Sequence, residues 1–176
     1  LSLQIPHREN DLTMTLPAFG LITDCIRSHA HAAPHRMALV EGAQMLNYAQ
    51  LDAAMDRVAA TLQRDGLGPG DAIAICAANS VDAAVIYLGA LRAGVVVAPL
   101  APGAGTASLQ RMASDAQARW LFADESLEDS AFGAPRIAIG PHRAQAPGRA
   151  LESWLLPAGA QPAAVTIEPD SPFNII

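Results

Sequence analysis

The chain has 176 residues, a length that corresponds to one domain or to part of a larger one. It carries 11 basic residues, all of them Arg, against 17 acidic ones, and the net charge of −6 argues against nucleic-acid binding, which requires a basic face. Hydrophobic residues make up 51% and charged residues 16%, which excludes a disordered chain. No apolar run is long enough for a transmembrane helix, which needs about 18 residues without charges or chain breakers. Two cysteines and no visible secretion signal favour the reducing cytoplasm.

The first elements are predicted after an N-terminal extension over residues 1–18. Within residues 19–32, apolar side chains recur at three- and four-residue steps and would form one stripe along a helix. This pattern predicts an amphipathic helix that stops before Pro34. The stripe comprises Leu21, Ile22, Cys25, Ile26 and His29. Two short apolar runs at 37–40 and 45–48 flank a glycine-containing turn and predict a β-hairpin.

The clearest helix is predicted to begin at Asn47. Its apolar stripe is Leu51, Met55, Val58 and Leu62, whereas Asp52, Asp56, Arg57 and Arg64 lie off that stripe. Gly66 is well placed to end the helix in a left-handed conformation. A β-rich run over 71–76 follows without alternating polarity, and it predicts a strand that is buried on both faces.

The pattern then repeats along the chain. Further elements are predicted as helices at 80–92 and 106–116 and as strands at 95–98, 120–123 and 137–139. Ser80 and Thr106 are the expected helix caps. Strands that alternate with helices at this spacing predict right-handed crossovers and a parallel sheet. The predicted fold class is therefore α/β, a doubly wound parallel sheet with flanking helices, preceded by a helix and a short β-hairpin.

Residues 133–172 differ in composition, since they hold seven of the 13 prolines. They predict a long Pro/Gly-rich connection across the surface, with a short helix at 151–155. At 170–176 a new buried strand is predicted, since a loop of this length normally leads back into a sheet. The chain looks cut there, because such a strand should lead on to a further element.

Glycine-rich segments are candidates for phosphate binding. A dinucleotide-binding strand should lead into G-x-G-x-x-G, but no glycine follows residues 71–76, which argues against a nucleotide-dependent oxidoreductase. Gly66, Gly68 and Gly70 precede a strand and predict a turn. The segment at 103–106 follows a strand and opens a helix, where backbone N–H groups meet anions, but the chain has no Lys for a phosphate loop.

Other chemistry-bearing residues give no complete site. Cys25 and His29 share a helix face at metal-ligand spacing, but His31 points elsewhere and Pro34 separates His35, so a polar helix end is favoured. Cys76 is interpreted as a small buried hydrophobe. The carboxylates Asp124, Glu125, Glu128 and Asp129 predict a solvated helix face. No catalytic, cofactor-binding or metal-binding residue is assigned.

Four segments together resemble a known family. Residues 46–51 are LNYAQL, similar to L-T/S-Y-x-E-L with Asn and Gln as departures, and residues 66–71 are GLGPGD, similar to G-L/V-x-P-G-D. Residues 78–80 match x-N-S. Residues 91–102 resemble L-K-A-G-x-x-x-x-P-L-x-P, with Ala101 in place of the usual Asp or Asn. In this order and spacing the segments resemble the AMP-forming acyl-CoA synthetases, whose relatives are peptide-synthetase adenylation domains, fatty acyl-AMP ligases and luciferases.

The resemblance covers about residues 19–176 and implies a partial N-terminal AMP-binding-type domain. In that family the strand resembling 170–176 runs into a Ser/Thr/Gly-rich loop that holds the ATP phosphates, so the chain is expected to stop before that loop. The full-length parent would use Mg²⁺ and ATP to convert a carboxylic acid to an acyl-adenylate, and coenzyme A would then displace AMP. The x-N-S segment tilts the resemblance toward acyl-CoA ligases. The fragment alone is expected to be inactive and to bind none of these cofactors tightly.

Two alternatives stay open. One is an adenylation domain or fatty acyl-AMP ligase that loads a carrier protein. The other is a non-catalytic α/β module that binds a partner, or a second copy, along the exposed sheet edge near 173–176.

Overall fold

The computed structural model describes residues 19–127, 132–142, 144 and 148–176. The predicted extension at 1–18, together with Glu128 and Asp129, lies outside the described residues. The elements in chain order are α1 (Ile22–Ala32), β1 (Met37–Glu41), β2 (Gln44–Asn47), α2 (Tyr48–Arg64), β3 (Ala72–Cys76), α3 (Val81–Arg92), β4 (Val96–Pro99), α4 (Thr106–Asp115), β5 (Ala118–Ala123), β6 (Arg136–Ala138), β7 (Arg149–Ala150) and α5 (Leu151–Trp154). Among the described residues, no helix has the length and hydropathy needed to cross a membrane.

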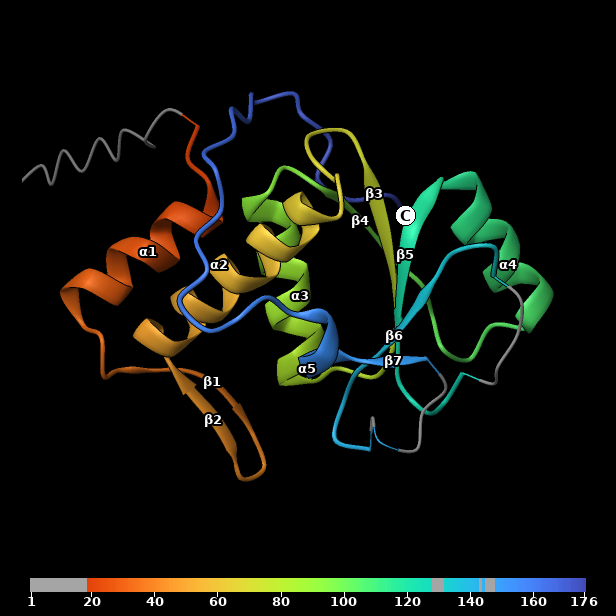
Figure 1. The fold of residues 1–176 in the computed structure, drawn as a ribbon, viewed down its shortest axis with the longest axis horizontal. Helices are drawn as coiled ribbons and strands as arrows, with labels where there is room; N and C mark the ends of the chain where they lie inside the picture. Colours follow the sequence, from red (N-terminus) through yellow and green to blue (C-terminus); the bar gives the residue numbers. More distant parts are fainter. Residues whose placement is uncertain (1–18, 128–131, 143, 145–147) are drawn as a thin grey trace, which may run out of the picture.

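The sheet confirms the predicted α/β fold class. Five strands pair in parallel in the order β4-β3-β5-β6-β7, and β1 and β2 form the separate antiparallel hairpin. Helix α3 connects β3 to its neighbour β4, whereas α4 leads from β4 back across β3 to β5. The two crossovers lie on opposite faces of the sheet, with α2, α3 and α5 on one face and α4 on the other (Figure 1).

The strand residues alternate in size rather than in polarity. All five residues of β3 are buried, and Ile73 and Ile75 face the cluster that contains α2 and α3, whereas Ala74 and Cys76 face the cluster that contains α4. Because both faces are covered, the strand contains no polar residue, as predicted for a parallel sheet. In β3 the large residues therefore face α2 and α3, and the small residues face α4.

The boundaries of α2 and α3 confirm the predicted caps. The Asn47 side chain accepts a hydrogen bond from the Gln50 backbone (2.9 Å), and the Gln50 side chain accepts one from the Asn47 backbone (2.9 Å). This is a capping box, so the two departures from the L-T/S-Y-x-E-L pattern keep its physical role. The Ser80 hydroxyl accepts from the Ala83 backbone (3.2 Å) and caps α3.

Two predictions for other helices were wrong in detail. The N-cap of α4 is Gly105, and no side chain caps it, because Thr106 already lies in the first helical turn. In α1, Ile26 is buried whereas Cys25 and His29 are exposed, so the stripe predicted from spacing is narrower in the structure. The exposed His29 ring contacts Tyr48 instead (4.9 Å between centroids).

A charged cluster joins α1, α2 and α3 beneath the surface. The Arg92 side chain is 7% exposed; its guanidinium contacts the carboxylates of Asp52 (2.6 Å) and Asp56 (2.8 Å) and donates to the carbonyl oxygen of Thr23 (3.1 Å). Arg27 closes the cluster from α1 through ion pairs to both carboxylates. Burial alone lowers the pKa of Arg27, but Asp56 and Asp52 raise it above the ordinary value. Asp56, predicted to lie off the apolar stripe, is therefore buried because it is fully paired.

The last predicted strand differs from expectation. Residues 170–176 were predicted as a buried strand, but Phe173, Ile175 and Ile176 are exposed. A single parallel bridge joins Asn174 to Val97 of β4. The segment is exposed because, in the described chain, nothing covers its outer side.

Helix contact between α2 and α3 predicts the effect of a small substitution. A Cβ added at Gly89 would lie 2.6 Å from Cβ of Val58, which is fixed to the α2 backbone and cannot rotate away. Gly89→Ala gains about 0.5–1 kcal/mol of helix propensity but causes overpacking of about 1–3 kcal/mol, so we expect a net loss of stability. Chemical denaturation measures it. Gly103→Ala, which meets nothing within 4 Å, is the control, and equal stability of the two variants would contradict the packing argument.

The charged cluster predicts an asymmetry between its two arginines. Arg92→Leu removes the buried partner of both carboxylates and leaves them only the half-exposed Arg27, so it should lower the free energy of unfolding by about 3–5 kcal/mol. Arg27→Leu removes a side chain that is 43% exposed and should cost about 1 kcal/mol or less. Urea denaturation of both variants checks this, and an equal loss would show that the buried pairing does not dominate.

Candidate active-site groove

The sheet topology predicts where a ligand crevice forms. The chain leaves the carboxyl end of β3 toward α3 on one face, and it leaves neighbouring β4 toward α4 on the other face. Loops that diverge from adjacent parallel strands open a crevice outside their carboxyl ends. A groove of about 610 Å³ lies at that place, between the β3–α3 loop and the β4–α4 loop.

Two of the recognised sequence segments line this groove. Asn79 and Ser80 come from the x-N-S segment after β3, and Leu100 and Pro102 come from the segment after β4. Tyr87 of α3 contributes the remaining polar side chain, and burial raises its pKa. Backbone pairing sets the loop spacing, since the Leu100 N–H donates to the Ile75 carbonyl (2.8 Å).

The amino end of α3 reaches the groove, and two of its first backbone donors are already engaged by side chains. Glu41 of the hairpin accepts from the Val81 backbone (2.7 Å), and Ser80 accepts from the Ala83 backbone (3.2 Å). The hairpin thus places a carboxylate at the positive, amino end of the α3 dipole, where a negative charge stabilises the helix. An anion would have to displace these caps, so the described groove is an uncharged wall rather than a phosphate cradle.

Asp124, at the carboxyl end of β5, supports the loop beneath the groove. Its carboxylate accepts hydrogen bonds from the Ala78 backbone (2.7 Å), the Ser126 backbone (3.0 Å) and the Ser126 hydroxyl. Burial alone raises the pKa of Asp124, but these hydrogen bonds and the nearby Arg136 guanidinium lower it overall. The prediction of a solvated helix face was wrong for this residue, because Asp124 is buried in the turn after a strand; its neighbour Glu125 is exposed in that turn.

Cys76 lies beside this carboxylate. It is fully buried, and burial together with the Asp124 charge raises the pKa of its thiol to about 11. The thiol is therefore protonated and unreactive at neutral pH, in agreement with its interpretation as a small hydrophobe.

The GLGPGD segment and Gly94 lie at the opposite, amino end of the strands, before β3 and β4. Gly66 and Gly70 have positive φ angles (76° and 89°), and the ring of Pro69 lies 3.0 Å from where a Cβ on Gly94 would be. The Asp71 carboxylate accepts from the Gly68 backbone (2.9 Å). GLGPGD and the glycine after α3 therefore pack against each other, and both are structural turns.

The remaining candidates stay apart from the groove. The segment at 103–106 opens α4 at the surface without a positively charged side chain. Within the described part of the chain, no group of three or more His, Cys, Asp or Glu side chains is arranged to hold a metal ion. A second cavity, of about 480 Å³, lies between the start of α1, helix α3 and residues 166–173.

The Asp124 hydrogen bonds predict a pH-dependent stability. Because the pKa of Asp124 is lower in the folded chain, its stabilisation is fully present above the ordinary Asp pKa of about 4 and is lost as pH falls through the lower folded value. Asp124→Asn should cost about 2 kcal/mol at neutral pH, with the difference from wild type shrinking below about pH 4. Urea unfolding from pH 3 to 7 checks this, with Glu125→Gln as the exposed control. A constant difference across that range would contradict the account.

Curated relatives match about two thirds of the chain. A linear gramicidin synthase from Brevibacillus parabrevis is 33% identical over 118 residues, which are 67% of this chain and 2% of that protein. Malpibaldin synthetase from Mortierella alpina is 36% identical over 118 residues, again 67% of this chain and 2% of that protein. The chain therefore spans only a small part of these relatives.

Solved structures share the fold at low sequence identity. A protein described as a long-chain-fatty-acid CoA ligase from Rhodopseudomonas palustris aligns with a TM-score of 0.77 and 20% identity, over 88% of this chain and 40% of that one. The N-terminal domain of FACL13 from Mycobacterium tuberculosis gives 0.73 and 23%, over 89% of this chain and 41% of that one. A family model described as AMP-binding enzyme matches residues 26–176. On this match and on the topology of its sheet, the chain belongs to the AMP-binding, adenylate-forming enzyme family.

Proposed function

We propose that this chain is the amino-terminal scaffold of an enzyme that activates a carboxylic acid. In the proposed reaction a carboxylate oxygen attacks the α-phosphorus of ATP, pyrophosphate leaves, and an acyl-adenylate forms. A thiol then attacks the acyl carbon, and the bond to AMP breaks. We propose coenzyme A as the thiol, in a cytoplasmic enzyme whose substrate is a small-molecule acid.

The direction of the last residues is the observation that supports this proposal most. Val97 donates to the carbonyl oxygen of Phe173 (3.1 Å), and Ile175 donates to the carbonyl oxygen of Val97 (2.9 Å). Residues 173–175 thus run parallel to β4, toward the strand ends that border the groove. A loop that follows such a strand reaches the crevice at the topological switch point, as nucleotide-binding loops do in α/β sheets.

The described residues do not by themselves form an ATP site. The Val81 and Ala83 donors at the start of α3 are engaged by Glu41 and Ser80, and residues 103–106 carry no positive charge. A triphosphate needs free N–H groups together with cationic partners. We therefore assign the present residues a positioning and water-excluding role at the wall of the groove, and no chemical step to them.

The curated relatives favour a second acceptor. The proteins that match at 33% and 36% identity are named as a linear gramicidin synthase and a malpibaldin synthetase, respectively, and neither name refers to coenzyme A. The second candidate is therefore an adenylation domain that transfers its acyl group to the thiol of a carrier protein.

Pyrophosphate exchange into ATP tests the proposal. We expect the complete natural polypeptide that contains this chain to catalyse acid-dependent exchange with at least one member of a panel of aliphatic, aromatic and amino acids. The 176-residue chain alone is the matched control and should be inactive. AMP release with coenzyme A or with a carrier protein as acceptor then separates the two candidates. Absence of exchange from the folded complete polypeptide with every acid would contradict the proposal and favour a non-catalytic module.

A further inference from the structure

After β7 the chain crosses from one edge of the sheet to the other before its last residues pair with β4. Strand β7 is at one edge of the sheet, but residues 173–175 pair with β4 at the opposite edge. Between them the chain passes over α2 before it returns to the sheet (Figure 1). We call residues 154–163 of this crossing the strap.

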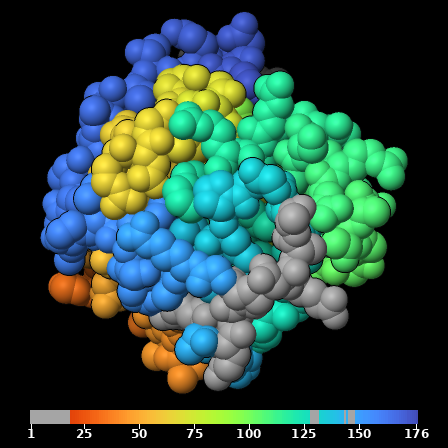
Figure 2. Space-filling view, turned by 45° about the vertical axis from the view of Figure 1, so that its right-hand side comes forward, coloured from red at the N-terminus to blue at the C-terminus, as the bar shows by residue number. Residues whose placement is uncertain are grey.

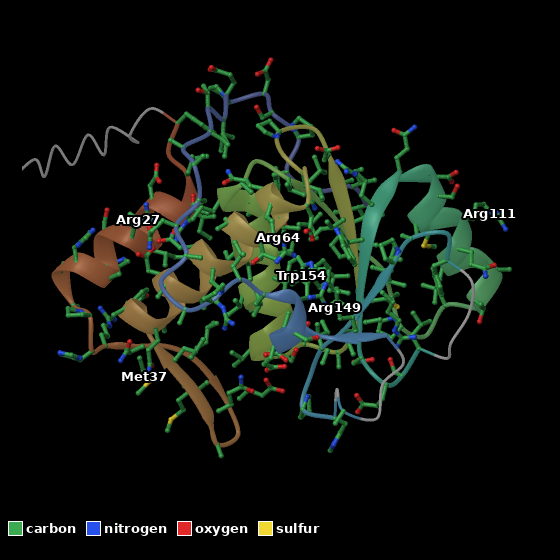
Figure 3. All side chains as sticks on the ribbon, in the orientation of Figure 1. Arg27, Met37, Arg64, Arg111, Arg149 and Trp154 are labelled. Carbon is green, nitrogen blue, oxygen red and sulfur yellow. The ribbon has the colours of Figure 1, made fainter. Side chains whose placement is uncertain are left out.

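The strap begins at a deeply buried anchor. Trp154 is fully buried, its ring packs edge-on against Phe122 (5.1 Å between centroids), and its indole N–H donates to the Asp65 carboxylate (2.7 Å). Arg64 of α2 donates to the Trp154 carbonyl oxygen (3.1 Å). Figure 3 shows Arg64 and Trp154 next to each other, and Figure 2 shows the strap region, in blue, against the end of α2 and the following turn, in yellow.

Beyond Trp154, helix α2 holds the backbone of the strap through hydrogen bonds from its side chains. The Thr61 hydroxyl accepts from the Leu156 N–H (3.0 Å), and Arg57 donates to the Leu156 carbonyl oxygen. Gln63 makes a paired contact, since its amide nitrogen donates to the Ala163 carbonyl oxygen (2.9 Å) and its amide oxygen accepts from the Ala163 N–H (2.8 Å). Such contacts fix the path of a segment without requiring particular side chains in it.

The Gln63 contact determines the length of the loop between the last anchored strap residue and the residues that pair with β4. Phe173 follows Ala163 by ten positions, whereas it follows Leu156, the preceding strap contact, by seventeen. The entropic cost of closing a flexible loop rises with its length, so losing the nearer anchor weakens pairing at Val97 by about twofold through loop length alone. The turn at 168–171, where Glu168 and Ser171 exchange hydrogen bonds (3.0 Å each), lies within this stretch.

We propose that Gln63 is a positioning residue that stabilises the pairing of residues 173–175 with β4 and thereby the approach of the following loop to the groove. The second part rests on the proposed function. Gln63 does not line the groove. Its two hydrogen bonds to Ala163 lie on the exposed side of α2, and they influence the groove through the strap and the pairing of residues 173–175 with β4.

Hydrogen exchange of the 176-residue chain tests the structural part. In Gln63→Ala, the amides of Val97 and Ile175 should exchange about two- to tenfold faster, whereas the amides of Ala74 and Ile75 in central β3 and the Tm should not change. Gln63→Glu keeps an oxygen that accepts from the Ala163 N–H, so its exchange rates at Val97 and Ile175 should lie between those of wild type and Gln63→Ala.

The matched control is Gln161→Ala, the same substitution at an exposed strap residue. It should leave exchange at Val97 and Ile175 as in wild type. Wild-type exchange at these amides in Gln63→Ala, or the same acceleration in both variants, would overturn the proposal.

Kinetics of the complete polypeptide test the link to the site. Gln63→Ala should raise KM for ATP about two- to tenfold with little change in kcat, and Gln63→Glu should recover part of it. If Gln63→Ala only destabilised the fold, a smaller fraction of the enzyme would be active, and the apparent kcat would fall at constant KM. Faster exchange with unchanged KM would overturn the link to the groove. Inactive wild type would refute the proposed function, while the exchange experiment would still decide the role of Gln63.

Discussion

Burial of the central strand on both faces is the constraint on which the rest of the structure depends. β3 has a neighbour on each side and helices on both faces, so all five of its residues must be apolar. Its alternation of Ile with Ala and Cys assigns α2 and α3 to the face with the large side chains and α4 to the other. Once the helices divide in this way, the loops after β3 and β4 diverge, and the groove follows from the topology.

The two ends of the sheet have different roles. At the amino end, Pro69 packs against Gly94, and Asp71 holds the turn, so the recognised glycine and proline segments stiffen the scaffold. At the carboxyl end, Asn79 and Ser80 border the groove, and the Asp124 carboxylate fixes the loop behind them. Segments that lie far apart in the chain thus contribute either to stability or to the crevice according to the strand end they occupy.

Local patterns predicted most of the fold because its elements follow local rules. The Asn47 cap, the Ser80 cap and the buried run of β3 are each determined by nearby residues, and the structure confirms them. The predictions for Asp56 and Asp124 failed because a distant partner changes the environment of each. Asp56 is buried because Arg92, 36 residues away, neutralises it, and Asp124 is buried because it holds the Ala78 backbone. One signal was present for the groove, since x-N-S and the segment after β4 both follow strands of one sheet.

The groove itself could not be identified as a site from single residues. Asn79 and Ser80 carry no charge, and a neutral pair after a strand is common in loops. The strap was also missed, since beyond Trp154 α2 holds it through hydrogen bonds to the backbone of Leu156 and Ala163, which leave no side-chain pattern in the sequence. These features depend on long-range backbone contacts, which periodicity does not record.

Determining the coding sequence beyond codon 176 tests the central claim most directly, because the account requires a phosphate-binding loop where residues 173–175 direct the chain. The account predicts a Ser/Thr/Gly-rich stretch that ends in Pro-Lys immediately after this strand. A stop codon at that position would contradict it, since the groove would then lack the loop that acid activation requires.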